Sequence, residues 1–196
     1  MSHLNEQPIY AIEGPDGAGK TSVVDELSGV EGIITAKTPS KRYRENRELY
    51  DSGFVSAAER FRFYRDGISD VFNEIDFDSI SQSDSLVLDR YTISLGLYHN
   101  ILSNSGRFPI SEITNNLPVA RAHIILIPDE DDMFRRISER YSERTDHHME
   151  TDKAFLKKIR NGYSAISGKN VFKIDSTEKD LSEVVDECLR IIQMTR

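Results

Sequence analysis

Short apolar runs alternate with longer stretches of mixed character along this chain. Each run is bounded by glycine, proline or charged residues, which is typical of a buried strand. Five runs predict strands, at residues 8–14, 32–37, 84–90, 122–128 and 170–175. The stretches that follow them predict helices, over residues 19–28, 55–76, 92–102, 130–144, 151–167 and 180–194. In the second of these helices, apolar residues recur near helical spacing from Phe54 to Phe72.

The alternation of strand and helix predicts the fold class. Strands that are apolar on both faces occur in parallel sheets covered by helices on each side. We therefore expect an α/β fold with a five-stranded parallel sheet and helices on both faces. Because no repeat or linker interrupts residues 1–196, a single domain is predicted. Ligands of such folds bind beyond the carboxyl ends of the strands, so the residues there are the first candidates for a site.

The charge balance and the apolar content disfavour several classes of partner. The 196 residues carry a net charge of −8, which disfavours binding to a nucleic-acid backbone. No apolar run approaches the roughly 20 residues that span a bilayer, and the polar N-terminus lacks the apolar core of a signal peptide. A single cysteine, Cys188, leaves no disulfide framework and no thiolate zinc site. We expect a cytoplasmic protein with small-molecule ligands and with neither nucleic-acid nor membrane partners.

A glycine-rich loop joins the first predicted strand to the first predicted helix. The stretch Gly14–Thr21 matches the phosphate-binding pattern G-x-x-x-x-G-K-[ST] in that setting. Glycines let backbone N–H groups turn toward phosphate oxygens, and the helix N-terminus adds partial positive charge. Lys20 would neutralise the terminal phosphates and Thr21 would offer its hydroxyl to Mg²⁺, so ATP and Mg²⁺ are the predicted cofactors. The residues expected to hold the nucleotide are Gly14, Gly17, Ala18, Gly19, Lys20, Thr21 and Ser22.

The residues that follow the later strands restrict the class of reaction that the protein can catalyse. The third strand ends in the letters DRYT, residues 89–92, without the glycine of a GTPase D-x-x-G motif, and no Asn-Lys pair follows the fifth strand. A small kinase remains, and a kinase needs a lid that excludes water. Residues 135–152 suit that purpose, because Arg136, Arg140 and Arg144 share one helical face and would stabilise the transferring phosphoryl group. The competing interpretation of this face is a solvated helix surface with i,i+4 ion pairs.

Three blocks of the sequence resemble the thymidylate kinase family. They are the P-loop with Asp16 inside it, the stretch DRYTISLGLYH at residues 89–99, and the arginine-bearing lid before DKAFLKK. The resemblance extends over most of the chain and agrees in length and in element order. It implies a P-loop nucleotide-kinase fold with a helical lid of the bacterial type, ATP- and Mg²⁺-dependent transfer to a nucleoside monophosphate, and a homodimer.

The resemblance also implies roles for individual residues. Asp16 would accept a hydrogen bond from the 3′-hydroxyl of the acceptor, and Arg90 would bind its phosphate. Asp89 would help to order the Mg²⁺ and phosphate site. Ser94 and Tyr98 would line the acceptor pocket. The lid arginine Arg140, Arg144 or both would contact the transferring phosphate.

Three positions depart from the family's pattern where the acceptor would bind. The second strand leads into Lys37 and Thr-Pro-Ser in place of an arginine-bearing R-E-P-G-G-T stretch, so Lys37 would supply charge without a bidentate fork. Phe63 would stack on the base, but Gly67 replaces the arginine expected four residues on. His99 stands in place of a base-reading glutamine and can donate or accept a hydrogen bond. The acceptor base is therefore left open.

Taken together, these residues predict a nucleoside-monophosphate kinase, with dTMP as the first acceptor to consider. The alternative enzyme is a kinase of another or modified nucleotide, or of an unphosphorylated nucleoside. Arg90 and Lys37 favour a phosphorylated acceptor over the nucleoside. The alternative outside enzymes is a nucleotide-binding regulatory protein without catalysis. The residues that argue against it are the intact Lys20, Thr21, Asp89 and Arg90.

Overall fold

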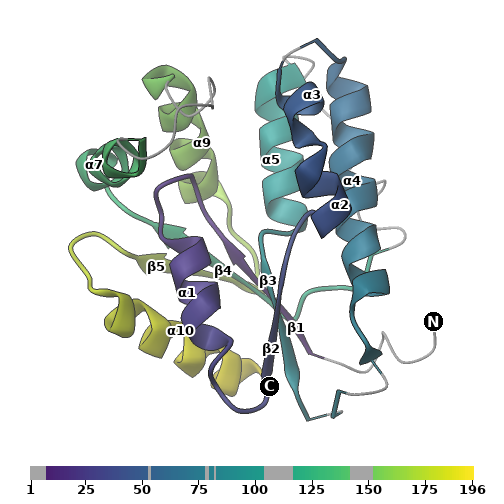
Figure 1. Ribbon diagram of the computed structural model, residues 1–196. Helices are drawn as coiled ribbons and strands as arrows, with labels where there is room; N and C mark the ends of the chain where they lie inside the picture. The colour runs from purple at the N-terminus through teal and green to yellow at the C-terminus, as the bar shows by residue number, and fades with distance from the viewer. Residues whose placement is uncertain (1–7, 53, 78–79, 82, 104–116, 142–151) are drawn as a thin grey trace.

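A parallel sheet lies between helices in the computed structural model of the chain (Figure 1). The structure describes residues 8–52, 54–77, 80–81, 83–103, 117–141 and 152–196. Strands neighbour one another in the order β2-β3-β1-β4-β5, and every pairing is parallel. The strands are β1 (Ile9–Glu13), β2 (Ile33–Lys37), β3 (Ser85–Asp89), β4 (Ala122–Ile127) and β5 (Val171–Asp175). The predicted fold class is confirmed.

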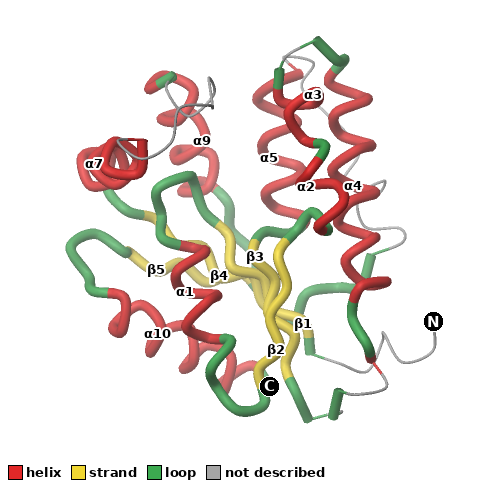
Figure 2. Tube along the Cα trace, viewed as in Figure 1, coloured by secondary structure: helices red, strands yellow, loops and turns green. Residues whose placement is uncertain are grey.

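Helices connect the strands and flank the sheet (Figure 2). They are α1 (Lys20–Leu27), α2 (Lys41–Glu45), α3 (Arg47–Asp51), α4 (Ala57–Glu74), α5 (Thr92–Ser103), α7 (Glu130–Tyr141), α9 (Lys153–Ala165) and α10 (Leu181–Thr195). Among the described residues, no helix is long and apolar enough to cross a membrane.

The two faces of β1 show why its apolar residues are continuous. Tyr10 and Ile12 pack with α1 and α10 in one core cluster, whereas Ile9 and Ala11 pack with α4 and α5 in another. Cys188 is buried in the first cluster, as expected for a structural thiol, and burial raises its pKa to about 12. Because each face is covered, side chains of both alternating sets are apolar.

The predicted elements agree with the observed ones apart from their ends and two short helices. The pattern places Phe54 in line with the long helix, but this residue precedes the helix and is 90% exposed, because α4 begins at a capping box formed by Ser56 and Glu59. The sequence pattern did not predict α2 and α3, since five-residue helices are too short to show periodicity. Residues 142–151, which include most of the predicted lid, lie outside the described residues.

The order of the strands places the P-loop at the centre of the carboxyl edge. The strand before this loop, β1, lies between β3 and β4. The chain continues from β1 to β2 on one side, and after β3 it crosses to β4 on the other. Such a switch in strand order opens a crevice beyond the strand ends, where ligands of open α/β sheets bind.

Candidate active site

Close packing and a left-handed backbone explain the glycines at two positions of the P-loop. Gly14 has φ 143° and Gly17 has φ 82°, both values that residues with a side chain rarely adopt. A Cβ atom on Gly14 would lie 2.4 Å from the carbonyl oxygen of Leu126, and one on Gly17 would lie 2.8 Å from that of Met133. The loop is therefore held directly against the end of β4 and against α7.

Lys20 and Thr21 begin α1 and lie at the centre of the site. Lys20 is buried, and its Nζ donates to the carbonyl oxygen of Pro15 at 2.7 Å across the loop. Burial and then the nearby Arg90 guanidinium lower the pKa of Lys20 to about 8, although the surrounding carboxylates oppose this shift. Thr21 Oγ1 donates to Asp89 Oδ2 at 2.8 Å, which brings together a hydroxyl and a carboxylate from two elements. Oxygen atoms of this kind are the ligands that Mg²⁺ takes, so these two residues fit the predicted ion.

Asp16 points away from this phosphate cradle and toward β3 and α5. Its carboxylate forms an ion pair with Arg90 and accepts a hydrogen bond from the Tyr98 hydroxyl at 2.8 Å. Burial alone would raise the pKa of Asp16, but Arg90, Lys20 and the Tyr98 hydrogen bond outweigh it and hold the pKa at about 2. The group is therefore a carboxylate at neutral pH.

The backbone at Arg90 has an unusual conformation that directs its side chain into the site. Its φ is 70°, a left-handed value that is uncommon for a residue with a side chain. Hydrogen bonds on both sides hold the peptide: Arg90 N donates to the Ile12 carbonyl at 2.9 Å, and Thr38 Oγ1 donates to the Arg90 carbonyl at 3.1 Å. Backbone strain of this kind concentrates at functional sites.

Glu13, the last residue of β1, is a buried carboxylate that the sequence interpretation did not single out. Its Oε1 accepts from the backbone N–H groups of Tyr91 and Ile93 at 3.1 and 3.2 Å, and its Oε2 accepts from Ser94 N at 3.2 Å and from the Ser94 hydroxyl. The carboxylate thus satisfies the open N-terminus of α5 and complements its dipole. An acidic residue at the end of an otherwise apolar strand was the available signal.

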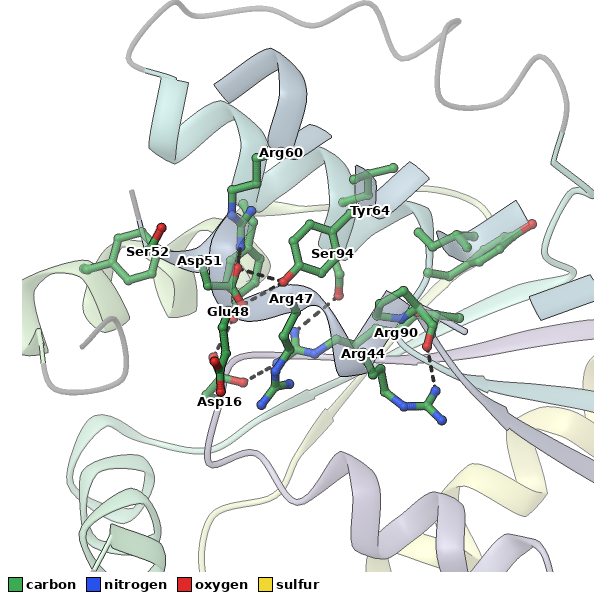
Figure 3. A pocket seen from close by; sticks show the side chains of 17 residues that line it. Asp16, Arg44, Arg47, Glu48, Asp51, Ser52, Arg60, Tyr64, Arg90 and Ser94 are labelled. Carbon is green, nitrogen blue, oxygen red and sulfur yellow. Dashed lines mark hydrogen bonds and ion pairs between the residues drawn. The ribbon is translucent and has the colours of Figure 1, made fainter. Parts of the chain in front are cut away.

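A cavity of about 520 Å³ opens on the Asp16 side of the P-loop (Figure 3). Of the predicted acceptor residues, Asp16, Arg90, Ser94 and Tyr98 line it. Figure 3 shows Asp16 at its lower side and the α4 residues Arg60 and Tyr64 at its upper side. The remaining lining residues are Thr38, Pro39, Arg44, Arg47, Glu48, Asp51, Ser52, Arg60, Tyr64, Ile68, Tyr91, Leu95 and Phe155.

A second cavity, of about 420 Å³, lies on the other face of the P-loop. The predicted nucleotide-binding residues Gly17, Ala18, Gly19 and Ser22 line it. Arg140, one of the two predicted lid arginines, lines it as well, and it also helps to lower the pKa of Asp16. The other predicted lid arginine, Arg144, lies outside the described residues.

Two neighbouring arginines of α7 complete this wall of the second cavity. Arg135 and Arg136 both line it, and Arg136 is held by Asp132 at 2.5 Å and by the Ser176 carbonyl at 2.8 Å. Both interpretations of this helix face apply to α7. Arg135 forms an i,i+4 ion pair with Glu139 at 2.8 Å, as on a solvated helix surface. Arg140 lines the cavity beside the P-loop, as expected of a phosphate-binding arginine.

Three predicted acceptor residues are not among the described residues that line the acceptor cavity, and their roles stay predictions. Lys37 Nζ pairs with Asp25 at 2.9 Å near the surface. The Phe63 ring stacks on Tyr50, with ring centroids 3.7 Å apart, and so already has an aromatic partner. His99 is only 3% exposed and packs edge-on against Phe61, because it follows Tyr98 by one residue and turns to another face of α5.

The sequence interpretation missed a group of charged and polar side chains in the acceptor cavity. They belong to α2, α3 and the first two turns of α4, and they are Arg44, Arg47, Asp51, Arg60 and Tyr64. The sequence feature that could have identified them is the charge-rich stretch that follows β2, because residues after the carboxyl ends of the strands meet at the site. Arg44 is anchored there by donating from Nη1 to the carbonyl oxygens of Lys37 and Pro39, at 2.8 and 2.6 Å.

Comparison with known proteins agrees with this geometry. A family profile described as thymidylate kinase matches residues 12–188, which is most of the chain. The chain belongs to the thymidylate kinase family. Its membership makes it a phosphotransferase of the nucleoside-monophosphate kinase type, and this family uses ATP and Mg²⁺.

One solved structure similar to this thymidylate kinase family member is a thymidylate kinase from Candida albicans. The similarity has a TM-score of 0.73 at 19% sequence identity and covers 96% of this chain and 92% of the other. This likeness shows that the two share a fold. A search of the curated proteins finds no match.

Proposed function

We propose that this protein transfers the γ-phosphoryl group of ATP to a (deoxy)nucleoside monophosphate, with dTMP as the first acceptor to test. The observation that carries the proposal is the two-sided P-loop. Its Asp16 lines one cavity and its next residues, Gly17 to Gly19, line the other. A donor and an acceptor bound on opposite faces of one loop would meet at Lys20, and holding two reactants in this way is a large part of phosphoryl-transfer catalysis.

On the donor side, this chain's residues would act on the phosphates of ATP. Backbone N–H groups at the start of α1 and the Lys20 ammonium would bind the phosphates, and Arg140 would add charge from α7. Thr21 and Asp89 would hold Mg²⁺, which supplies charge neutralisation on the phosphates when it is bound. No covalent intermediate is invoked, because positioning and charge stabilisation suffice for this chemistry.

On the acceptor side, Asp16 would accept the sugar hydroxyl and Arg90 would bind the acceptor phosphate. Arg44 would add a second guanidinium beside Arg90, because Arg44 lines the same cavity whereas Lys37 does not. Two guanidinium groups favour a phosphorylated acceptor over a nucleoside, since each can bind phosphate oxygens with two parallel hydrogen bonds. A kinase of another nucleotide remains the second candidate, and broad substrate specificity is ascribed to the Candida albicans thymidylate kinase.

An ATP-consumption screen tests the proposal. The purified protein is offered dTMP, the other common monophosphates and the matching nucleosides with ATP and Mg²⁺. We expect turnover with at least one monophosphate, dTMP foremost, and far less with the nucleosides. Turnover with other monophosphates but not with dTMP would support the proposed phosphoryl transfer and exclude dTMP as the acceptor. No turnover with any monophosphate would refute the proposed function.

Substituting Asp16→Asn provides the second arm of the same screen. The variant keeps the shape of the side chain but removes the charge that Arg90 and the acceptor hydroxyl would share. We expect kcat/KM for the acceptor to fall by about 100-fold or more while ATP still binds, in keeping with the loss of a positioned charged group. Asp25→Asn is a suitable control, because that aspartate pairs with Lys37 at the surface and lines neither cavity.

A further inference from the structure

The acceptor cavity contains a second polar cluster, formed by Asp51, Arg60 and Tyr64. The Tyr64 hydroxyl donates to both carboxylate oxygens of Asp51, at 2.7 and 2.8 Å, and Arg60 Nη2 lies 2.9 Å from Asp51 Oδ1. The Arg60 guanidinium also lies over the Tyr64 ring, 4.6 Å from its centroid. All three side chains line the cavity, and Figure 3 shows Arg60 and Tyr64 reaching toward Asp51.

The cluster is more buried than an ordinary surface ion pair. The side chains of Arg60 and Asp51 are 16% and 19% exposed. Arg60 Nε is buried, and within the described part of the chain it has no hydrogen-bond partner. Burial and then the Asp51 charge raise the pKa of Tyr64, so that its hydroxyl stays protonated and keeps donating. A buried ion pair gains little net stability, because removing its charges from water costs about as much as the pair returns. Apolar residues could therefore hold α3 against α4 equally well. The presence of polar groups here points to a ligand that binds them.

The cluster lies at a different end of the cavity from the groups that would hold the sugar and phosphate. Asp16 and Arg90 belong to the carboxyl edge of the sheet, whereas Arg60 and Tyr64 belong to the first two turns of α4. The apolar side chains of Ile68, Leu95 and Phe155 line the same cavity. A planar base attached to a sugar at Asp16 would pack on such apolar groups and present its edge to the cluster.

We propose that Asp51, Arg60 and Tyr64 read the edge of the acceptor's nucleobase. The proposal rests on the proposed function and assigns its specificity. Arg60 donates to a carbonyl oxygen or ring nitrogen of the base, Asp51 accepts from a ring N–H or an exocyclic amine, and Tyr64 fixes the carboxylate. The site thus takes a base that presents an acceptor beside a donor, as the O4 and N3–H edge of thymine does.

The test compares Arg60→Lys with Arg62→Lys. Both residues belong to α4, but Arg62 is exposed and lines neither cavity. Lysine keeps the charge and removes the planar fork. In assays with dTMP, dCMP, dAMP and dGMP, Arg60→Lys should lower kcat/KM for the best acceptor by about tenfold or more and compress the ratio between best and worst acceptors similarly. Arg62→Lys should leave both quantities unchanged, and Tyr64→Phe should produce a smaller change in the direction of Arg60→Lys.

An acceptor analogue without a base separates base reading from a merely structural role. The inhibition constant of 2-deoxyribose 5-phosphate, measured against the best acceptor, should be the same for the wild-type protein and Arg60→Lys. Equal losses for this analogue and for the best acceptor, or unchanged ratios among the four monophosphates, would overturn the inference. A wild-type protein that phosphorylates no monophosphate in the ATP-consumption screen would refute the proposed function instead, so the two failures are distinguishable.

Discussion

Lys20 has a charge that depends on its surroundings more than a surface lysine's does. Burial and the Arg90 guanidinium together bring its pKa to about 8, so the free protein loses this positive charge as the pH rises through that value. Phosphate oxygens placed beside the ammonium group favour the charged form and raise its pKa again. Binding of ATP and protonation of Lys20 are therefore linked.

This linkage predicts how ATP binding depends on pH. Well below pH 8 Lys20 is already protonated, so ATP binding takes up no proton on it there. Well above pH 8 binding should take up about one proton and weaken by up to about tenfold per pH unit. Calorimetric titrations at pH 9, in two buffers of different ionisation enthalpy, measure this uptake. In Lys20→Arg, whose guanidinium stays charged, the difference between the buffers should vanish. Identical heats in both buffers for the wild-type protein would contradict the prediction.

At the level of single residues, the sequence predicted chemistry better than it predicted direction. Asp16, Arg90, Ser94 and Tyr98 share one cavity because the P-loop, the end of β3 and the helix α5 that follows it fix where their side chains begin. His99, predicted to read the base, is buried against Phe61 and does not line the cavity, because one residue along a helix turns a side chain by about 100°. Such a rotation decides whether a side chain lies in the core or in the cavity. It depends on how the helix packs against its neighbours, which a single sequence does not reveal.

At the level of elements, Gly67 explains how α2 packs against α4. A Cβ atom on Gly67 would lie 2.5 Å from Pro39 Cβ and 2.9 Å from Tyr43 Cγ, and the Gly67 carbonyl accepts from Ser40 N at 2.9 Å. The family's sequence pattern has an arginine at this position, where this chain has Gly67. The structure instead shows a close contact that only glycine permits, which fixes the segment bearing Pro39 against the acceptor cavity.

Alanine substitutions at two helical glycines test this contact. Gly67→Ala should lower the free energy of unfolding by about 1–3 kcal/mol, because the rigid Pro39 ring and the inner atoms of Tyr43 cannot move aside easily. Gly162→Ala is matched for helix propensity, but its Cβ meets only the side chain of Leu97, nearest at the terminal Cδ1, which can change rotamer. Urea denaturation of both variants measures the difference. Equal midpoints for the two would show that α2 tolerates displacement.

The short helices α2 and α3 illustrate what a sequence pattern leaves undetermined at this scale. The long helices were predicted from periodicity, and the strands from apolar runs between breakers. Five-residue helices contain too few turns for either signal, although they carry Arg44, Arg47 and Asp51 to the cavity. The part of the acceptor site built by short elements was therefore the part that could not be predicted.

At the level of the whole molecule, the central feature is that two cavities share one loop. A ligand that occupies both should bind far better than either nucleotide, because the second half binds at a high effective concentration once the first is held. The homodimer and the cytoplasmic location expected from the sequence remain predictions at this scale.

A linked nucleotide tests whether the two cavities act as one site. Adenosine and the best acceptor nucleoside joined through five phosphates should bind at least about 100-fold tighter than ATP, as avidity predicts when the linker matches the span. Competition against a fluorescent ATP analogue measures the affinity. Two adenosines joined in the same way are the control, and equal affinity for both compounds would show that the second cavity does not take the acceptor.

The ion pair between Asp16 and Arg90 has a consequence for which anions the site rejects. Before any ligand arrives, each group already neutralises the other, so a free inorganic phosphate that approaches Arg90 must displace a carboxylate and leave Asp16 without its guanidinium partner. A nucleoside monophosphate would bring both a phosphate for Arg90 and a sugar hydroxyl for Asp16, and would thus replace both halves of the pair. In a cell rich in inorganic phosphate, this internal salt would keep the acceptor site available for the ligand that carries both groups.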